Sequence, residues 1–422
     1  MAFHISLAHP SAQVRVQVEG TRERHKVGKT VPLAGVQPAL LRWAREPAHL
    51  SLEDVAGRLK KPVEEIAAWE EPGTGAPSYA QLEKLAYELY RRPLAIFFLP
   101  SPPAEPKAEA EFRALPDADL RHLSRDTVFL IRRARDFQAS LVELFGVRSP
   151  VADPLWKRVS LDASKPFGPQ AAAVRAALGV PAPGAVEWGA ANGDDALKRW
   201  RKAIEAGGVF VFKDTFKQQE ISDFCLEHAE LPVVMINNST AKTRQVFSLL
   251  HELAHILMRR TAISTFDDAP LQRLPAPEQV IERFCNRIAA EILVPAQDFA
   301  AQVAGFPRVV EGVPQARFVA LAERYRVSRE VILRRFRDAD RISQAFYEER
   351  KREWDGQIGG KASSGGSFYL TKGAYLSERL MSEVFARYGR RQISVDEAAD
   401  FIGVKPKQVD EIESRFLRGL AA

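Results

Sequence analysis

The sequence has few of the features that would place it outside the ordinary globular proteins. Among 422 residues it has only two cysteines, Cys225 and Cys285, and both lie in apolar stretches. Two isolated cysteines in a chain of this size argue against a disulfide framework and predict buried thiols in a reducing compartment. The sequence also lacks a long hydrophobic run. Its most apolar short stretch, PLAIFFLP, is far below the roughly 20 residues that a membrane span needs.

A strong excess of one charge is missing as well. The 60 Lys and Arg residues are nearly matched by 54 Asp and Glu residues, so the net charge of +6 favours anionic partners only mildly. The opening residues, MAFHISLAHPSAQ, lack the charged and then apolar segments of a signal peptide. We therefore expect a cytoplasmic protein with no membrane partner. At this length, and with 46% hydrophobic residues, two to four globular domains are expected.

Composition and periodicity divide the chain into successive segments. The prolines of PSPPAEP end a first helical segment, because successive prolines cannot continue a helix. The Gly/Ser-rich stretch GQIGGKASSGG marks a flexible linker near the C-terminus. The predicted segments are an extension at 1–35, a helical bundle at 36–106, a larger domain at 107–300, a helical region at 301–355, the linker at 356–367 and a helical domain at 368–422.

Apolar residues recur at three and four positions through most of the chain, which predicts helices. Ser51 and Ser78 stand where helix N-caps are needed. The stretch RFVALAERYRVSREVILRRFRDADR predicts two helices joined at Arg326 and Val327. The period changes only in GGVFVF, ISDFCLEH and LPVVMINN, which are rich in β-branched and aromatic residues and predict three strands of a small sheet. The expected fold class is therefore α+β and mostly helical.

The stretch VFSLLHELAHILMRR predicts a buried helix that carries His251, Glu252 and His255. Positions four apart share a helix face, so the two imidazoles can bind one ion while Glu252 is offset to reach a water beside it. Apolar residues surround the helix on nearly every side, and buried ionisable groups cost several kcal/mol unless a partner satisfies them. This HExxH pattern therefore predicts a zinc site with Glu252 as the catalytic base.

A hydrolytic zinc site needs a third protein ligand and an open fourth position. A third histidine at the metzincin spacing would fall at Thr261, so that class is excluded. Asp267 and Asp268 lie in a loop and could serve. Glu282 is the better candidate, because it lies on a second predicted helix with Asn286 one turn later on the same face.

Other residues near the motif have simpler interpretations. Ala289 and Ala290 would let the second helix approach the first closely. Glu291 is expected to be a solvated helix residue, and His228, at a strand end, a structural histidine. Cys285 is near enough to face the site, but a fourth protein ligand would fill the position that a hydrolase leaves open for water.

These motifs resemble a known family. The combination LPVVMINN…QVFSLLHELAHILM…IERFCNRIAAEILVP is similar to the ImmA/IrrE metallopeptidases, and LLRWAREPAHLSLEDVAGRLKKPVEEIAAWEE resembles the Xre-type helix-turn-helix that many members carry. The resemblance covers about residues 36–340, and the tail is of a kind seen in longer members. It implies a gluzincin-like zinc site with His251, His255 and Glu282 as ligands, Glu252 as general base and Asn286 beside the ligands.

The resemblance implies that the protein cuts a helix-turn-helix repressor in a loop. The LPVVMINN strand is expected to bind the substrate backbone as an added strand. The alternative is a DNA-binding transcriptional regulator or an antitoxin, in which the metallopeptidase fold binds a partner protein such as a toxin. The complete HELAH motif favours the enzyme.

The expected recognition helix, PVEEIAAWEE, departs from the usual pattern. Phosphates and guanines are normally contacted by Arg and Lys. This helix is instead acidic, through Glu64, Glu65, Glu70 and Glu71. Positive charge is confined to the turn before it, at Arg58, Lys60 and Lys61. The bundle is therefore as suited to protein as to DNA, and the basic REVILRRFR segment is a second candidate for DNA contact.

Overall fold

The computed structural model describes residues 31–103, 123–181, 183, 190–218, 221–265, 274–357 and 373–420. Most of the extension predicted at 1–35 and of the linker predicted at 356–367 lies outside these residues, as do Asp267 and Asp268. The expected fold class is confirmed, because the protein is mostly helical with one small mixed sheet. None of the described helices is both long and apolar enough to cross a membrane.

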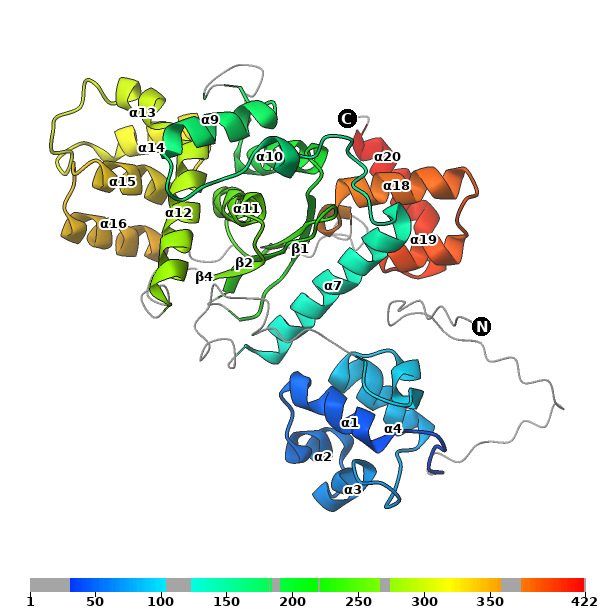
Figure 1. Ribbon diagram of the computed structural model, residues 1–422. Helices are drawn as coiled ribbons and strands as arrows, with labels where there is room; N and C mark the ends of the chain where they lie inside the picture. Colours follow the sequence, from blue (N-terminus) through cyan, green and yellow to red (C-terminus); the bar gives the residue numbers. More distant parts are fainter. Residues whose placement is uncertain are drawn as a thin grey trace.

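The N-terminal part is a bundle of short helices around its own hydrophobic core (Figure 1). The helix starts predicted at Ser51 and Ser78 are both confirmed. The Ser51 hydroxyl accepts the Asp54 N–H at 3.1 Å, and the Ser78 N–H donates to the Gln81 side chain at 2.7 Å. The elements are α1 (Pro38–Arg45), η1 (Glu46–Ala48), α2 (Leu52–Leu59), α3 (Val63–Trp69), α4 (Tyr79–Lys84), η2 (Leu85–Tyr90) and η3 (Leu94–Phe98).

Helices α2 and α3 form the pair that the sequence predicts. They are joined by a short turn in which Lys60 adopts a left-handed conformation, with φ of 55°. Pro62 is the N-cap of α3, a position that needs no N–H donor for the bonds of the helix. Val55 and Ile66 of the two helices are buried in the same core. The assignment of this pair to the Xre type stays a prediction.

A four-stranded sheet lies at the centre of the remaining chain, with the order β1-β3-β2-β4. Strands β1 and β3 are parallel, and β2 runs antiparallel to both of its neighbours. The three predicted strands are confirmed as β1, β2 and β3. The bounds are β1 (Phe210–Asp214), β2 (Ile221–Leu226), β3 (Val233–Asn237) and β4 (Ala262–Thr265).

Strand β4 is a fourth strand, which the prediction of three strands missed. Its four residues, AIST, are too few to show a strand period, and the strand exists because its backbone pairs with β2. The expected role of LPVVMINN as a docking strand is also wrong. Strand β3 lies between β1 and β2, so both of its hydrogen-bonding edges are occupied. Strand β4 is an edge strand of the described sheet, because it pairs only with β2. It also contacts the HExxH helix.

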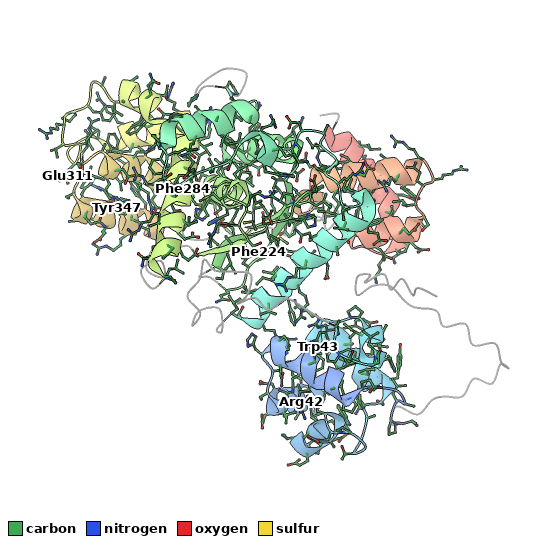
Figure 2. All side chains as sticks on the ribbon, viewed as in Figure 1. Arg42, Trp43, Phe224, Phe284, Glu311 and Tyr347 are labelled. Carbon is green, nitrogen blue, oxygen red and sulfur yellow. The ribbon has the colours of Figure 1, made fainter. Side chains whose placement is uncertain are left out.

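Both faces of the sheet are covered by helices, which explains why its strands read as nearly continuous apolar runs (Figure 1). On one face, Phe212 of β1 stacks on Phe137 of α7 at a centroid distance of 4.2 Å. Figure 2 marks the cores on the two sides of the sheet by Phe224 and Phe284. The helices on the Phe224 side are α7 (Arg125–Phe145), α18 (Glu378–Gly389), α19 (Val395–Ile402) and α20 (Val409–Leu420), with the short η6 (Pro406–Gln408).

A buried arginine fastens the C-terminal helices to the sheet. Arg201 Nη2 donates to the Val211 carbonyl at 2.8 Å, and Arg201 Nη1 donates to the Ala374 carbonyl at 2.9 Å. Arg379 of α18 donates to the Glu205 carbonyl at 2.8 Å. These bonds to backbone carbonyls satisfy charged groups that would be costly to bury alone.

The opposite face of the sheet packs against the helices that form the candidate site. The buried Phe336 of α15 belongs to the same core as Leu253 of α11, so α14–α16 join the HExxH helix in one hydrophobic unit. The helices on this side are α8 (Leu155–Arg158), α9 (Phe167–Ala177), α10 (Gly193–Ala206), α11 (Lys242–Leu257), α12 (Ala276–Leu293), α13 (Ala296–Gln302), α14 (Gln315–Tyr325), α15 (Arg329–Asp338) and α16 (Gln344–Gln357).

Glu291 corrects another expectation. It is not solvated but 7% exposed, and its carboxylate pairs with Arg335 of α15. Arg335 also donates to the Val294 carbonyl. The basic REVILRRFR segment therefore uses this arginine to hold α15 against α12, because the tertiary fold brings an acidic partner to it.

Lys213 of β1 provides a test of the buried charges behind the sheet. Burial, together with the charges of Arg201 and Lys242, lowers the pKa of Lys213 to about 7. An unfolded lysine keeps its proton up to about pH 10.5, so between these two values the unfolded state binds more protons and stability rises with pH. We expect Lys213→Met to stabilise the fold at pH 7 by at most about 4 kcal/mol, and by much less at pH 10. Thermal unfolding at the two pH values measures this.

The matched control is Lys202→Met, at an exposed position of α10. It removes the same charge without relieving burial, and its effect should stay within about 0.5 kcal/mol at both pH values. An equal gain for Lys213→Met at pH 7 and pH 10 would show that the lysine is protonated in the folded state.

Candidate metal centre and its cleft

Helix α11 presents the three polar residues of the HExxH motif from a buried position. It lies between α10 and the sheet, with α12 beside it (Figure 1). His251, Glu252 and His255 are 5%, 0% and 1% exposed. Because successive helix residues are rotated by about 100°, the two histidines point toward α12 while Glu252 points toward β2 and β4.

Glu282 of α12 completes a compact group with the two histidines. The Nε2 atoms of His251 and His255 are 3.1 Å apart. They lie 3.3 Å and 3.2 Å from the Glu282 carboxylate oxygens. The close approach of α12 that Ala289 permits is present, since this residue is fully buried in the shared core. Among the described residues, these three form the only group with the donor types and spacing of a metal site. We refer to His251, His255 and Glu282 as the metal group.

The donor set fits a tetrahedral zinc ion. Zinc–nitrogen and zinc–oxygen bonds of about 2.0–2.1 Å place neighbouring ligand atoms about 3.3 Å apart. The ligand-atom distances in the group are 3.1–3.3 Å. Two imidazoles and one carboxylate are also the donor set of zinc hydrolases, which leave a fourth position open.

The electrostatics of the group favour a positive charge between its members. Burial opposes the charge of His251, but the hydrogen bond and negative charge of Glu282 outweigh burial and raise the pKa of this histidine. Burial likewise opposes the charge of Glu282, and the two histidines outweigh it and hold the pKa of this carboxyl far below its usual range. A cation bound at the Nε2 atoms would supply the same positive charge that a proton supplies there.

Glu252 is held by a residue that the sequence does not single out. The Ser264 hydroxyl, on β4, donates to Glu252 Oε1. The other carboxylate oxygen, Oε2, is buried and has no hydrogen-bond partner among the described residues. One oxygen of Glu252 is thus anchored while the second is available. A sequence search would find Ser264 only by recognising β4.

Asp223 is a second carboxylate beside Glu252 that sequence reasoning missed. It is 2% exposed, lines the cleft and accepts a hydrogen bond from the Asn237 N–H at 3.3 Å. Burial raises the pKa of Asp223 to about 7, and the negative charge of Glu252 contributes to the shift. The run ISDFCLEH contains no motif that marks Asp223. The pairing of β2 with β3 and β4 is what places Asp223 beside Glu252.

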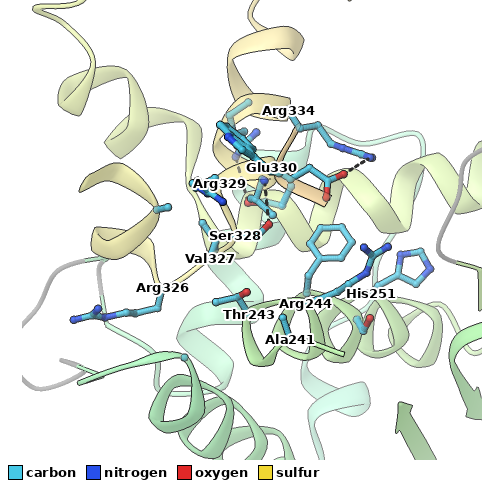
Figure 3. Close-up of a pocket in the computed structure, with 18 of the residues that line it drawn as sticks. Ala241, Thr243, Arg244, His251, Arg326, Val327, Ser328, Arg329, Glu330 and Arg334 are labelled. Carbon is cyan, nitrogen blue, oxygen red and sulfur yellow. Dashed lines mark hydrogen bonds and ion pairs between the residues drawn. The ribbon is translucent and has the colours of Figure 1, made fainter. Parts of the chain in front are cut away.

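A cleft of about 680 Å³ opens over the metal group and continues toward α14, α15 and α16 (Figure 3). His251, Glu282 and Asn286 line the end of the cleft at the metal group. Figure 3 shows Arg244 and His251 on α11 facing Glu330 and Arg334 on α15. The cleft has the size of a site for an extended ligand.

The remaining sequence-predicted residues also have defined positions. His228 Nδ1 accepts the N–H groups of Glu230 and Leu231, both at 3.1 Å, so it closes a turn as a structural histidine. Cys225 and Cys285 are fully buried free thiols, as expected. Cys285 Sγ is 3.7 Å from His255 Nδ1, on the side of the imidazole that does not face Glu282.

Comparison with known proteins supports a peptidase relationship for part of the chain. Residues 204–337 match the family model of the IrrE N-terminal-like domain of peptidase family M78. The matched segment begins near the end of α10 and includes the sheet, both helices of the metal group and α15. A search of curated proteins finds no significant match to the chain. The match thus supports the ImmA/IrrE resemblance over this segment and leaves the N-terminal bundle unassigned.

Proposed function

We propose that this protein is a zinc endopeptidase that cuts a regulatory protein. The observation that carries the proposal is the buried group of His251, His255 and Glu282, of which His251 and Glu282 line the cleft. Glu252 follows His251 on the same helix. The peptidase family match to the same segment supports the proposal. In the proposed site His251, His255 and Glu282 hold zinc, and Asn286 lies beside them at the cleft surface.

The roles of the residues follow from their positions. Zinc, when bound, supplies Lewis acidity that makes water a stronger acid and polarises the peptide carbonyl. Glu252 Oε2 accepts the proton of the attacking water and transfers it to the leaving amine. Ser264 holds Oε1 and so fixes the direction of Oε2. The enclosed position of Glu252 excludes bulk water from the carboxylate.

Within the proposal, the substrate is a helix-turn-helix repressor or a related regulator. The support is the ImmA/IrrE resemblance together with a cleft of about 680 Å³ that reaches from the metal group to α16. The test is incubation of the zinc-loaded protein with the product of the neighbouring gene and with a peptide library. New N-termini that are identified by mass spectrometry with the wild type, and are absent with Glu252→Gln, support it. If the product of the neighbouring gene stays intact while library peptides are cut, the proposed substrate is wrong.

Ser264 is expected to act as a positioning residue for Glu252. Ser264→Ala should lower kcat about tenfold and leave KM nearly unchanged, because the hydrogen bond to a charged carboxylate is lost but the substrate contacts remain. Ser264→Thr keeps the hydroxyl and should restore most of kcat. A parallel rise of KM in Ser264→Ala, with no rescue by threonine, would assign the serine to substrate binding or to the fold.

A second candidate function is DNA-bound regulation through the N-terminal bundle. The observation that favours it is that the two acids that follow α3 are paired with arginines of α1. Glu70 is 6% exposed and pairs with Arg45 at 2.7 Å, and Glu71 pairs with Arg42 at 3.1 Å. The exposed Arg58 and Lys60 then stand at the α2–α3 turn. Salt-dependent binding of duplex DNA by fluorescence anisotropy, lost in an Arg58→Gln/Lys60→Gln variant, is the test.

A further inference from the structure

The cleft has a second part, away from the metal group, which is lined by α14, α15 and α16. Its lining there combines charged side chains with the apolar Val319, Val331 and Trp354. The volume of about 680 Å³ exceeds that of one amino-acid side chain, so the cleft accommodates more of a substrate than the bond that is cut. The composition of this second part therefore bears on which peptides fit.

Arginines face this part of the cleft from two helices. Arg244 of α11 lies two helical turns before His251, and Arg329 and Arg334 belong to α15 on the opposite side (Figure 3). We refer to Arg244, Arg329 and Arg334 as the arginine wall. Lys351 of α16 lines the same part. Because the low-dielectric walls of a cleft focus the field of its charges, such a wall attracts an anionic group.

Two arginines of the wall are held in place by neighbouring side chains. Arg334 Nη2 lies 3.7 Å from Glu330 Oε1 and donates to the Tyr347 hydroxyl at 3.2 Å. The Arg329 guanidinium lies 4.7 Å from the centroid of the Trp354 ring. Both contacts restrict the side chain before a ligand arrives, so less conformational entropy is lost on binding.

The acidic side chains that line the cleft oppose the charge of the arginine wall only in part. Glu282 belongs to the metal group, and Glu330 is paired with Arg334. The raised pKa of Asp223, from burial and from Glu252, means that this carboxyl is partly protonated near neutral pH. Glu323 and Asp338 are exposed, where water screens their charge. A cation at the metal group adds to the positive potential.

We propose that the arginine wall binds an aspartate or glutamate side chain of the peptide substrate, to one side of the bond that is cut. This inference rests on the proposed function, because the peptide is the substrate of the same cleft. A carboxylate matches the planar donor geometry of guanidinium groups. Arg334 is the central contact, since it approaches from α15, on the side of the cleft opposite His251. The substrate class is then an extended segment with an acidic residue near the cleavage point.

The test uses binding, so that it does not depend on turnover. Zinc-loaded Glu252→Gln protein is incubated with a mixture of random decapeptides, and the retained peptides are sequenced by mass spectrometry. We expect Asp and Glu to be retained about fivefold over Asn and Gln at one position. Arg334→Gln in the same background should reduce this preference to less than about twofold. Glu330→Gln should increase it, because the competing carboxylate is removed.

The matched control is Arg337→Gln on the same helix, at a residue that pairs with Asp338 and does not line the cleft. The preference of this variant for acidic peptides should equal that of the Glu252→Gln protein without the second change. If Arg334→Gln unfolds, as judged by circular dichroism, Arg329→Gln takes its place. Equal retention of acidic and amide peptides would overturn the inference. Binding of a single-stranded DNA oligonucleotide that displaces the acidic peptides would overturn it too, since the wall would then be a nucleic-acid site.

The two proposals can fail separately, and the results that would show this differ. A wild-type chain that cuts no library peptide, while the Glu252→Gln protein still selects acidic ones, would reject the endopeptidase and keep the acidic preference. Cleavage that depends on Glu252 but shows no acidic preference would reject the inference and keep the endopeptidase.

Discussion

Replacement of Glu252 by Gln should reduce peptide hydrolysis by about 10³-fold and leave the bound zinc unchanged. The amide keeps the shape of the carboxylate and can still contact the Ser264 hydroxyl, but its oxygen is far too weak a base to accept a proton from water. Since His251, His255 and Glu282 are untouched, metal binding should persist. Hydrolysis is measured on a quenched-fluorescence peptide library, and zinc by mass spectrometry after dialysis.

The control for this variant is Glu227→Gln, which removes a carboxylate that pairs with Arg259 at 2.8 Å and does not line the cleft. Its hydrolysis rate should equal that of the wild type. Full activity in Glu252→Gln would exclude Glu252 as the base. Loss of zinc together with activity would instead place Glu252 among the ligands.

Removal of Glu282 as a ligand should have the second large effect. We expect Glu282→Gln to lose stoichiometric zinc, because a neutral amide oxygen replaces the only anionic donor of the group. Zinc at about 1,000 times its Kd should raise the Tm of the wild type by roughly 10 °C, since it binds only the folded state. The same addition should leave the Tm of Glu282→Gln almost unchanged. Thermal unfolding with and without a chelator measures both values.

Glu291→Gln provides a matched comparison on the same helix. Glu291 is as buried as a ligand would be, but its partner is Arg335 of α15. This variant should lower the Tm in the absence of metal, because Arg335 loses its partner, and it should still bind zinc. Equal zinc content in Glu282→Gln and the wild type would remove Glu282 from the ligand set.

Much of the metal group follows from the sequence because helix periodicity is local. Four-residue spacing places His251 and His255 on one face whatever the rest of the chain does. Surrounding apolar residues bury that face, and burial demands a partner for the imidazoles. Glu282 stands on a helix that is also predicted locally. Its distance to the histidines depends on how α11 and α12 pack, and the structure places the carboxylate 3.2 Å and 3.3 Å from them.

The errors of sequence reasoning have a common cause, which is dependence on distant partners. A segment such as AIST becomes a strand only because β2 supplies its hydrogen bonds. The position of β3 inside the sheet follows from the strand order, which no single strand sequence encodes. Glu291 looks like a solvated residue until α15 brings Arg335 to it. In each case the deciding contact joins residues that are far apart in the chain.

By itself, the sequence determined that the protein is mostly helical, that a short run of strands precedes a buried HExxH helix, and that two histidines share a face there. These features depend on neighbours within one or two turns. Only the tertiary structure decided which residues surround Glu252 and which helix lines the far side of the cleft. Ser264, Asp223 and Arg334 reach the site through strand pairing and helix packing, whose energies come from burial shared across the fold.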